Sequence, residues 1–399
     1  MLRGGQVFDG TGSPPESADV AFADGRIVAV GAGLDGDAAV DVTGCTVLPG
    51  LFDCHVHVVL DSIDPVGNSQ LPFSYQFFLA ARTLRVLLGL GITTVRDASG
   101  ADAGVRRAVA DGLVPGPRMQ ISIAMLSQTG GHGDGWMPCG RELSVFSAPH
   151  PGRPAAVVDG PDEVRRKVRE LLRLGADVIK VATSGGVLSS QSNPRHGHFR
   201  ADELAALVAE ASAAGRPVMA HAQATEGIKA AVRAGVRSIE HGIFLDDEAI
   251  DLMRERGTWL VPTLSAPHGV IAAAARGAML AEASVRKAHE VIEAHLDSYR
   301  RAAAAGVRVA MGTDTPCSPH GSNLGELRLM AARGAMSPAQ ALVAATSSAA
   351  ELLGLGDELG TLEPDKRADF VVVRGDALNF DELEGRVEQV WQDGRRVVG

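Results

Sequence analysis

Pro49-Gly-Leu-Phe-Asp-Cys-His-Val-His-Val58 is a short apolar run that carries two histidines one residue apart. Successive side chains of a β-strand point to opposite faces, so a strand here puts His55 and His57 on one face, with Cβ atoms about 6 to 7 Å apart. Both imidazoles can then reach one metal ion. The His-x-His pattern alone is a weak indication, because surface or capped histidines also produce it. The prediction of a metal site is strengthened by further candidate ligands later in the chain.

Segments of β character alternate with helical ones through the middle of the chain, a pattern typical of βα units around a parallel sheet. In residues 162–174, for example, Val164, Val168 and Leu171 recur at helical spacing, and the Ala-rich segments 201–214 and 281–305 also favour helices. The strand candidates are 51–58, 91–98, 118–124, 177–182, 217–222, 238–241, 258–262 and 308–313. Eight such strands predict an α/β fold, a closed (β/α)8 TIM-like barrel.

Both ends of the chain read as hairpins instead. Asp24-Gly25 separates two strand-like runs near the N-terminus, and Asp393-Gly394 does the same near the C-terminus. We therefore expect the termini to come together as one discontinuous β-sandwich domain, made of residues 1–49 and 358–399. Residues 50–357 would then form the barrel.

Composition narrows the class of protein. Hydrophobic residues make up 45% of the 399 residues, charged residues 22%, and no run approaches the roughly 18 apolar residues that a membrane span needs. Acidic residues exceed basic ones by 48 to 38, which disfavours a nucleic-acid or membrane partner and leaves a small-molecule substrate. The four scattered cysteines, with no Cys-x-x-Cys pair and no apolar leader at the N-terminus, favour a cytoplasmic location.

Side chains suited to binding a metal stand near the C-terminal ends of five strand candidates. They are His55, His57, Lys180, His221, His241 and Asp314. Each has a purely structural alternative: a satisfied core histidine, a buried ion-pair partner or a turn residue. A barrel, however, collects the C-terminal strand ends into one pocket, so all six are expected to converge there.

Lys180 needs its own argument, because a protonated ammonium is neither a metal ligand nor a favourable neighbour of divalent cations. A buried lysine with a lowered pKa can react with carbon dioxide, and the resulting carbamate is an anionic ligand whose two oxygens can bridge two metals. The other ligands then divide into His55, His57 and Asp314 for one ion, and His221 and His241 for the other. Nitrogen and oxygen ligands without sulfur favour two zinc ions, with manganese, iron or cobalt as alternatives.

Four strings resemble the metal-site motifs of the amidohydrolase superfamily, and more narrowly those of its imidazolonepropionase-like and Xaa-Pro dipeptidase (prolidase-like) branch. They are the opening run, Ile179-Lys-Val-Ala-Thr-Ser-Gly-Gly-Val187, Ile239-Glu-His-Gly242 and Gly312-Thr-Asp-Thr315. The segment 360–372 is similar to that superfamily's return into its β-domain. The resemblance implies a barrel with a β-sandwich, a binuclear centre with a carboxylated lysine, hydrolysis of an amide-type bond, and a homo-oligomer.

A dipeptide or an N-acyl or N-aminoacyl amino acid is the expected substrate. Two bridged metals would lower the pKa of a shared water enough to supply hydroxide near neutral pH, and one of them would polarise the scissile carbonyl. Asp314 would take the water's proton and deliver it to the leaving nitrogen, as its counterpart does in the superfamily.

Several residues are candidates for substrate contacts. His132 lies in the Gly-rich string Thr129-Gly-Gly-His-Gly-Asp-Gly135, within a long loop, residues 125–159, that we expect to act as a lid. The prolidase-like branch typically reads His-Ala-Tyr where this chain has His221-Ala-Gln223, so Gln223 is a candidate contact and proline specificity is in doubt. The other candidates are Arg195, His198, His320 and Asn323.

Two other functions stay open. A deaminase or cyclic amide (imidazolone-type) hydrolase of the same superfamily also uses His-x-His and a late aspartate, although the deaminases usually show His-x-x-Glu where position 224 here is alanine. A non-catalytic metal-binding or structural protein is the alternative from another class. No expected ligand is missing, which disfavours it.

Overall fold

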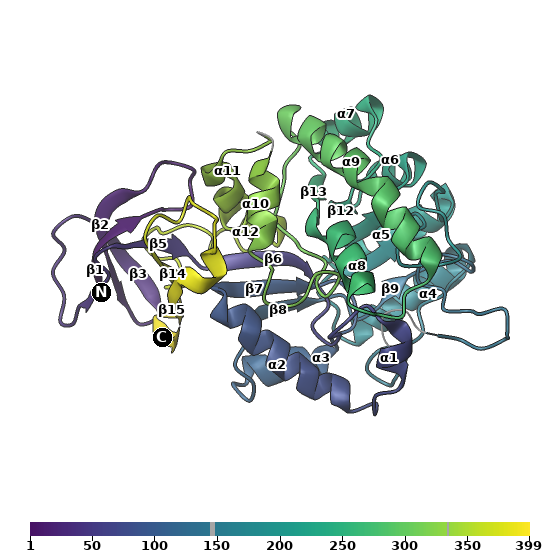
Figure 1. Ribbon diagram of the computed structural model, residues 1–399, viewed down its shortest axis with the longest axis horizontal. Helices are drawn as coiled ribbons and strands as arrows, with labels where there is room; N and C mark the ends of the chain where they lie inside the picture. The colour runs from purple at the N-terminus through teal and green to yellow at the C-terminus, as the bar shows by residue number, and fades with distance from the viewer. Residues whose placement is uncertain (144–147, 333–334) are drawn as a thin grey trace.

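The computed structural model describes residues 1–143, 148–332 and 335–399. Figure 1 shows an α/β part and, at one end of the molecule, a β-rich part built from both termini. The parallel strands of the α/β part are β6 (Leu51–Val56), β7 (Ile92–Asp97), β8 (Arg118–Ile121), β9 (Met125–Leu126), β10 (Ile179–Ala182), β11 (Val218–Ala222), β12 (Ser238–His241) and β13 (Trp259–Val261). They form a three-stranded sheet, β6-β7-β8, and a five-stranded sheet, β13-β12-β11-β10-β9.

Helices connect and cover these strands. They are α1 (Pro65–Ser69), α2 (Tyr75–Gly89), α3 (Ala103–Ala110), α4 (Gly160–Arg173), α5 (Ala201–Ala213), α6 (Thr225–Ala234), α7 (Asp247–Arg256), α8 (Ser265–Ala275), α9 (Glu282–Ala304), α10 (Gly325–Ala331), α11 (Pro338–Ala344) and α12 (Ser347–Leu352). The helices predicted at 162–174, 201–214 and 281–305 are confirmed as α4, α5 and α9. In the described part of the chain, no helix has both the length and the apolar character that a membrane crossing requires.

The last predicted strand, 308–313, is not a continuous strand, which corrects the expectation of eight regular strands. Its beginning contacts β13, where Leu260 donates a backbone hydrogen bond to Arg308 O (2.8 Å), and its end contacts β6, where Cys54 donates to Met311 O (2.9 Å). The pairing changes partner within a few residues, so only isolated bridges form, such as Leu260 with Val309. The two parallel sheets are nevertheless linked through this segment.

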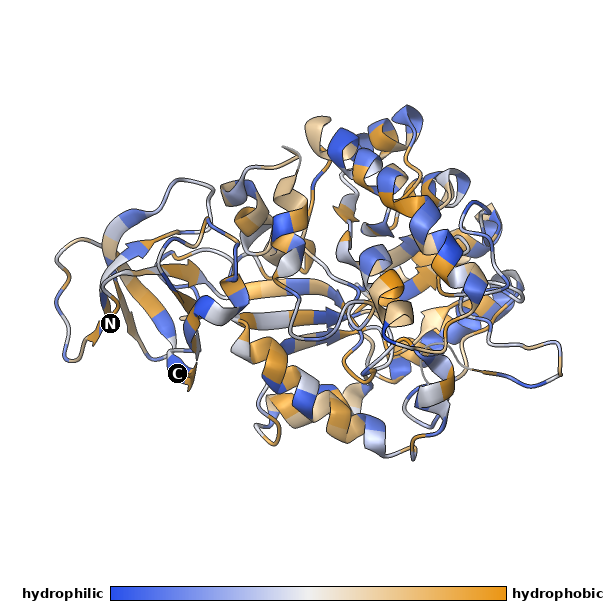
Figure 2. Ribbon diagram, in the orientation of Figure 1, coloured by the Kyte–Doolittle hydropathy of each residue, from blue (hydrophilic) through white to orange (hydrophobic). Residues whose placement is uncertain are grey.

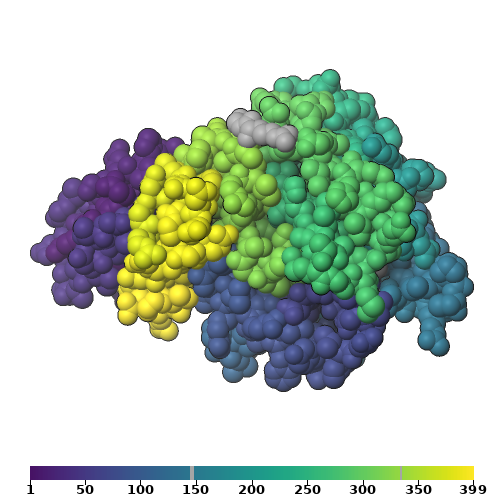
Figure 3. Space-filling view, viewed as in Figure 1, coloured from purple at the N-terminus to yellow at the C-terminus, as the bar shows by residue number. Residues whose placement is uncertain are grey.

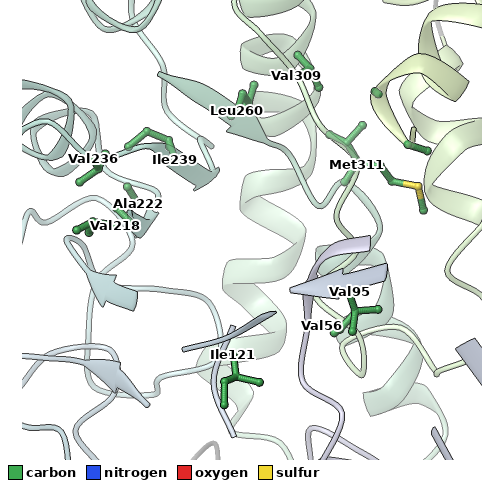
Figure 4. Packing of buried hydrophobic residues seen from close by; sticks show 14 of the residues in the cluster. Val56, Val95, Ile121, Val218, Ala222, Val236, Ile239, Leu260, Val309 and Met311 are labelled. Carbon is green, nitrogen blue, oxygen red and sulfur yellow. The ribbon is translucent and has the colours of Figure 1, made fainter. Parts of the chain in front are cut away.

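Apart from the half-buried β8, most of these strands are buried along their length, as expected for parallel strands covered by helices. Figure 2 shows hydrophobic residues alternating with polar ones along the central strands. One large cluster of buried side chains runs between the sheets and the helices, and Figure 4 shows part of it, including Val56, Ile121, Ile239 and Leu260. Fully burying one such side chain contributes about 1.5 to 3 kcal/mol. This core fixes the frame that positions the strand ends.

The β-rich part is one eight-stranded sheet with strands from both termini. Its strands are β1 (Leu2–Val7), β2 (Glu16–Ala23), β3 (Arg26–Gly31), β4 (Val40–Asp41), β5 (Cys45–Pro49), β14 (Phe370–Arg374), β15 (Val387–Gln392) and β16 (Arg395–Val398), with a short 3-10 helix, η2 (Leu383–Arg386). Antiparallel pairing of β14 with β5 joins the two ends of the chain. In Figure 3 the N-terminal and C-terminal segments accordingly lie side by side.

Both predicted hairpin turns are confirmed. Asp24 and Gly25 have φ values of 50° and 78°, and Asp393 and Gly394 have 48° and 71°, the positive values that a type I′ turn requires. The predicted β-sandwich is not confirmed, because the strands form one hydrogen-bonded sheet. Arg118 of β8 forms ion pairs with Asp369 and Asp393, which tie this sheet to the α/β part.

Candidate metal centre

A cavity opens at the C-terminal ends of the parallel strands. It encloses about 550 Å³, counting the space at its open mouth, which is within the range of small-molecule sites. Its lining includes all six predicted metal-binding residues and two of the predicted substrate contacts, namely His55, His57, Lys180, His221, His241, Asp314, His132 and Gln223. The structure therefore brings together residues that lie up to 259 positions apart in the chain, from 55 to 314.

Five of the six residues lie in a strand or directly after one, and Asp314 follows the irregular segment 308–313. His55 lies in β6, Lys180 in β10, His221 in β11 and His241 at the end of β12. His241 and Asp314 have positive φ values of 71° and 58°, which are uncommon for residues other than glycine. Such strained conformations are typical of functional sites, where the surrounding structure holds them in place.

The side chains approach one another closely. The Oδ1 atom of Asp314 lies 3.1 Å from His57 Nε2 and 3.4 Å from His55 Nε2. Lys180 Nζ lies 3.5 Å from His55 Nε2. Potential ligand atoms of His55, His241 and Asp314 all lie within 4.8 Å of one another. The ring centroids of His221 and His241 are 4.6 Å apart, so both belong to the same cluster.

Two of the four imidazoles donate a ring N–H to a backbone carbonyl on the outer side of the cluster. His57 Nδ1 lies 2.8 Å from Ser99 O, and His221 Nε2 lies 3.2 Å from Gly185 O. A carbonyl oxygen can only accept, so the proton of each neutral ring is on that nitrogen. The other ring nitrogen then carries a lone pair.

The remaining two imidazoles are oriented by side chains. His55 Nδ1 lies 2.8 Å from Glu240 Oε2, and His241 Nδ1 lies 2.7 Å from Thr263 Oγ1. The Thr263 hydroxyl itself donates to Pro262 O, so it accepts the hydrogen bond from His241. All four rings thus have one nitrogen occupied by an acceptor outside the cluster, the arrangement that fixes the tautomer of metal-binding histidines.

The charges of His221, His241 and Asp314 suit a divalent cation, whereas Lys180 suits one only when it is not protonated. Burial lowers the pKa values of His221 and His241 well below the ordinary value, so both rings are neutral near pH 7. Burial alone would raise the pKa of Asp314, but His55 and His57 hold it well below its ordinary range. Burial also lowers the pKa of Lys180 to about 8. The neutral imidazoles of His221 and His241 beside the ionised carboxylate of Asp314 fit zinc or a similar ion.

The ion pair between Arg96 and Glu240, which orients His55, was not predicted from the sequence. Arg96 of β7 donates to both Glu240 oxygens, at 2.9 and 3.1 Å, and also to Cys54 O at 2.7 Å. Burial alone would raise the pKa of Glu240, but Arg96 and His55 keep the pKa far below its usual value, so Glu240 is an anion. A signal existed: buried strands rarely contain charged residues unless these are paired. Arg96 and Glu240 are such residues in two buried strands.

His132 and Gln223 are the predicted substrate contacts that line the cavity. The His132 ring stacks on His221 with 4.1 Å between centroids. Burial lowers the pKa of His132 to about 3, so it is a neutral hydrogen-bonding group. The Oε1 atom of Gln223 is buried and has no hydrogen-bond partner among the described residues. Gln223 shares the lining of the cavity with the apolar side chains of Val187, Leu188, Ile243, Ala266 and Val270.

The other predicted contacts lie outside the cavity lining. The Arg195 side chain is exposed and its guanidinium lies 4.0 Å from the centroid of the Phe244 ring. His320 Nε2 lies 2.8 Å from Leu60 O. Asn323 donates to Asp53 Oδ2 at 2.9 Å, within a buried network. His198 is buried and donates its backbone N–H to Thr183 O. Residues 144–147 of the expected lid lie outside the described residues, and the lid stays a prediction.

Known proteins resemble this chain over its whole length. The family model described as the amidohydrolase family matches residues 46–397. An ochratoxinase from Aspergillus niger is 35% identical, with 100% of this chain and 86% of that protein covered. The crystal structure of a prolidase complexed with N-methylphosphonate-L-proline is 37% identical, with a TM-score of 0.90 over 100% of this chain and 98% of that one. A Xaa-Pro dipeptidase with bound methionine in its active site is 33% identical, with a TM-score of 0.90 and coverage of 100% and 99%.

The sequence match, the shared fold and the cluster of four oriented histidines with Asp314 and Lys180 agree with one another. The resemblance inferred from the four sequence strings is confirmed. The chain belongs to the amidohydrolase family and is a hydrolase that acts on amide bonds.

Proposed function

We propose that this enzyme cleaves the amide bond of a dipeptide or of an N-acyl or N-aminoacyl amino acid, and that it uses two divalent metal ions. The observation that carries the proposal is the orientation of the four imidazoles, each with its outer nitrogen bonded to a protein acceptor and all grouped around Asp314 and Lys180. The neighbouring cavity has room for a substrate of this size.

The names of the relatives support the substrate class. One is named for dipeptides that end in proline, one structure holds a proline-containing phosphonate, and one relative is named for ochratoxin. In this chain, the apolar wall would receive the apolar part of the substrate, and His132 and Gln223 would bind its polar groups. The carboxamide of Gln223 can both donate and accept, whereas the tyrosine of the prolidase-like branch presents one hydroxyl. Arg195 and His320 stay predictions as substrate contacts.

The residues fit a binuclear centre. His55, His57 and Asp314 would hold one ion, and His221 and His241 the other. With a pKa of about 8, about one Lys180 side chain in ten is neutral at pH 7. A neutral amine can add to carbon dioxide and lose a proton, and the carbamate would bridge the two ions with its oxygens. Zinc is the ion that we favour for this donor set.

Two such ions would lower the pKa of a bound water and polarise the scissile carbonyl. The protein's own residues would orient the substrate and move protons. Asp314 is ionised, so its carboxylate can accept the proton of the attacking water and then pass it to the leaving amide nitrogen. His132, which is neutral, can donate an N–H to a substrate carbonyl or carboxylate. Glu240 and Arg96 would keep His55 in the required orientation.

We also propose that the two parallel sheets act as one (β/α)8 barrel, since segment 308–315 makes backbone hydrogen bonds to both β13 and β6. The domain boundaries at residues 49 and 358, the sandwich and a homo-oligomer stay predictions. A cytoplasmic location is supported by the four cysteines, which are all free thiols.

A substrate screen tests the proposal. The zinc-reconstituted protein would be incubated with dipeptides and N-acyl amino acids, and released amine and ammonia would be measured separately. We expect amine release from one class of C-terminal residue. Ammonia alone would indicate a deaminase, and turnover limited to a cyclic amide would indicate an imidazolone-type hydrolase. Either result would overturn the proposed substrate class.

The role of His132 is tested by His132→Ala. Loss of the ring removes a substrate hydrogen bond and the stacking partner of His221, so kcat/KM should fall by about ten- to a hundredfold. Metal content should stay the same, because His132 is not among the proposed ligands. If neither kcat nor KM changes, His132 does not contact the substrate.

A further inference from the structure

The loop that follows β10, residues 184–192, touches the metal cluster from one side. Its Gly185 O accepts the hydrogen bond from His221 Nε2 at 3.2 Å. Gly186 lies so close to the His132 ring that a Cβ atom on it would be 2.3 Å from Cε1 of that ring. The backbone of this loop therefore restricts the positions of the His221 and His132 rings.

The same loop also shapes the substrate side of the cavity. Ser184 Oγ accepts a hydrogen bond from the backbone N–H of Gln223 at 2.7 Å. Val187 and Leu188 line the cavity, and Val187 packs in a buried cluster with Val270 of α8 and Val291 of α9. A displacement of the 184–192 loop would change the cavity wall as well as the surroundings of His221.

Two side chains at the start of α9 satisfy four carbonyls of this loop. Lys287 Nζ donates to Ser192 O at 2.5 Å, to Ser189 O at 2.7 Å and to Gly186 O at 3.4 Å. Ser284 Oγ donates to Leu188 O at 3.1 Å. Hydrogen bonds from an ionised donor are stronger than those between neutral groups. The ammonium of Lys287 is thus the main polar connection between the loop and the helix.

Further along α9, other side chains hold other backbone segments at the strand ends. His295 Nε2 lies 3.0 Å from His241 O and 2.7 Å from Pro262 O. Ser298 Oγ donates to Ile243 O at 2.7 Å. The 23-residue helix α9 is therefore a rigid support for the segments that follow β10, β12 and β13. Lys287 and Ser284 act on the 184–192 loop without lining the cavity, and Lys287 makes three of these four hydrogen bonds.

We propose that Lys287 is a positioning residue of the hydrolytic site: its ammonium binds three carbonyls of the 184–192 loop and so fixes the wall that contacts the substrate, His132 and His221. This inference rests on the proposed function for its catalytic consequence, but the ordering of the loop can be measured without any substrate. Loops held by few contacts open readily, so the loss of these hydrogen bonds should be visible as local opening.

The first experiment compares amide hydrogen exchange in the wild type, Lys287→Met, Lys287→Arg and Arg286→Met. Methionine keeps the length of the side chain and removes its donors, whereas arginine keeps charge and donors. Arg286 is the neighbouring cation, with 62% of its side chain exposed and Glu290 as its partner. We expect exchange in residues 184–192 to become about tenfold faster in Lys287→Met only. Unchanged exchange, or an equal increase in Arg286→Met, would overturn the inference.

The second experiment measures steady-state kinetics on the best substrate of the screen. Lys287→Met should raise KM by about tenfold and change kcat by less, with metal content retained, because the wall is misplaced while the ligands remain. Lys287→Arg should recover most of this loss, and Arg286→Met should behave as the wild type. An unaltered KM in Lys287→Met would contradict the positioning role.

The two experiments also separate this inference from the proposed function. If no amide substrate is found but exchange of the loop responds to Lys287→Met, the proposed substrate class fails and the role of Lys287 in ordering the loop stands. If hydrolysis is found but neither exchange nor KM responds, the positioning role fails and the proposed function stands.

Discussion

Asp314→Asn is expected to lower kcat by about 10³- to 10⁴-fold, the range associated with loss of a general acid or base. Asparagine has nearly the same shape as aspartate but is neutral and cannot accept the proton of the attacking water. The carboxylate of Asp314 lies 3.1 Å from His57 Nε2 and 3.4 Å from His55 Nε2, so the substitution also removes the negative charge at the centre of the cluster. The kinetic measurement is single-turnover and steady-state hydrolysis with zinc in excess.

Metal content separates these two effects. The histidines remain, so Asp314→Asn should still bind part of its zinc by elemental analysis. Asp162→Asn is the matched control, because that side chain is 97% exposed at the start of α4. A kcat of Asp314→Asn within about tenfold of the wild type would exclude Asp314 as the proton carrier.

Lys180→Ala should lose both metal and activity, with hydrolysis falling below detection. The side chain is buried in the cluster, with Nζ 3.5 Å from His55 Nε2, and the proposed carbamate would be a ligand of both ions. The truncation leaves a space that a small carboxylate can enter. Added acetate or propionate should therefore restore part of both metal binding and turnover.

The wild type offers a direct measurement of the modification. Protein prepared with carbon-13-labelled carbon dioxide should give a carbamate signal by NMR that is absent from Lys180→Ala. Lys366→Ala, in the β-rich part of the chain, is the control for nonspecific carbamates. Full activity in Lys180→Ala, or a wild type that is active without the signal, would contradict the bridge.

Much of the site followed from the sequence because strand periodicity is local. His55 and His57 needed only the two-residue repeat of β6, and His221 and His241 needed only the rule that parallel strands end at the same rim. The two hairpin turns were predictable because few residue pairs adopt positive φ at both positions, and Asp24-Gly25 and Asp393-Gly394 are of that kind. The His-x-His spacing and the two turns rest on neighbouring residues, and the shared rim rests on the expected barrel.

What could not be predicted depends on contacts between distant residues. The segment 308–313 has the composition of a strand, but whether it pairs regularly is decided by β13 and β6, on either side of it. Arg195 is a plausible partner for a carboxylate by charge, yet its stacking on Phe244 depends on how two loops pack. The contacts of Lys287 with three carbonyls could not be predicted from the sequence of α9, in which a lysine is expected to be an exposed cation.

A titration of the metal-free protein with zinc tests the central claim most directly, with bound metal and amide hydrolysis measured on the same samples. If the four oriented histidines, Asp314 and carboxylated Lys180 form a binuclear centre, activity should rise until two zinc ions are bound per chain and then level off. Removal of the zinc by a chelator should abolish activity, and re-addition should restore it. Full activity with one ion per chain, or hydrolysis that persists without metal, would contradict the account.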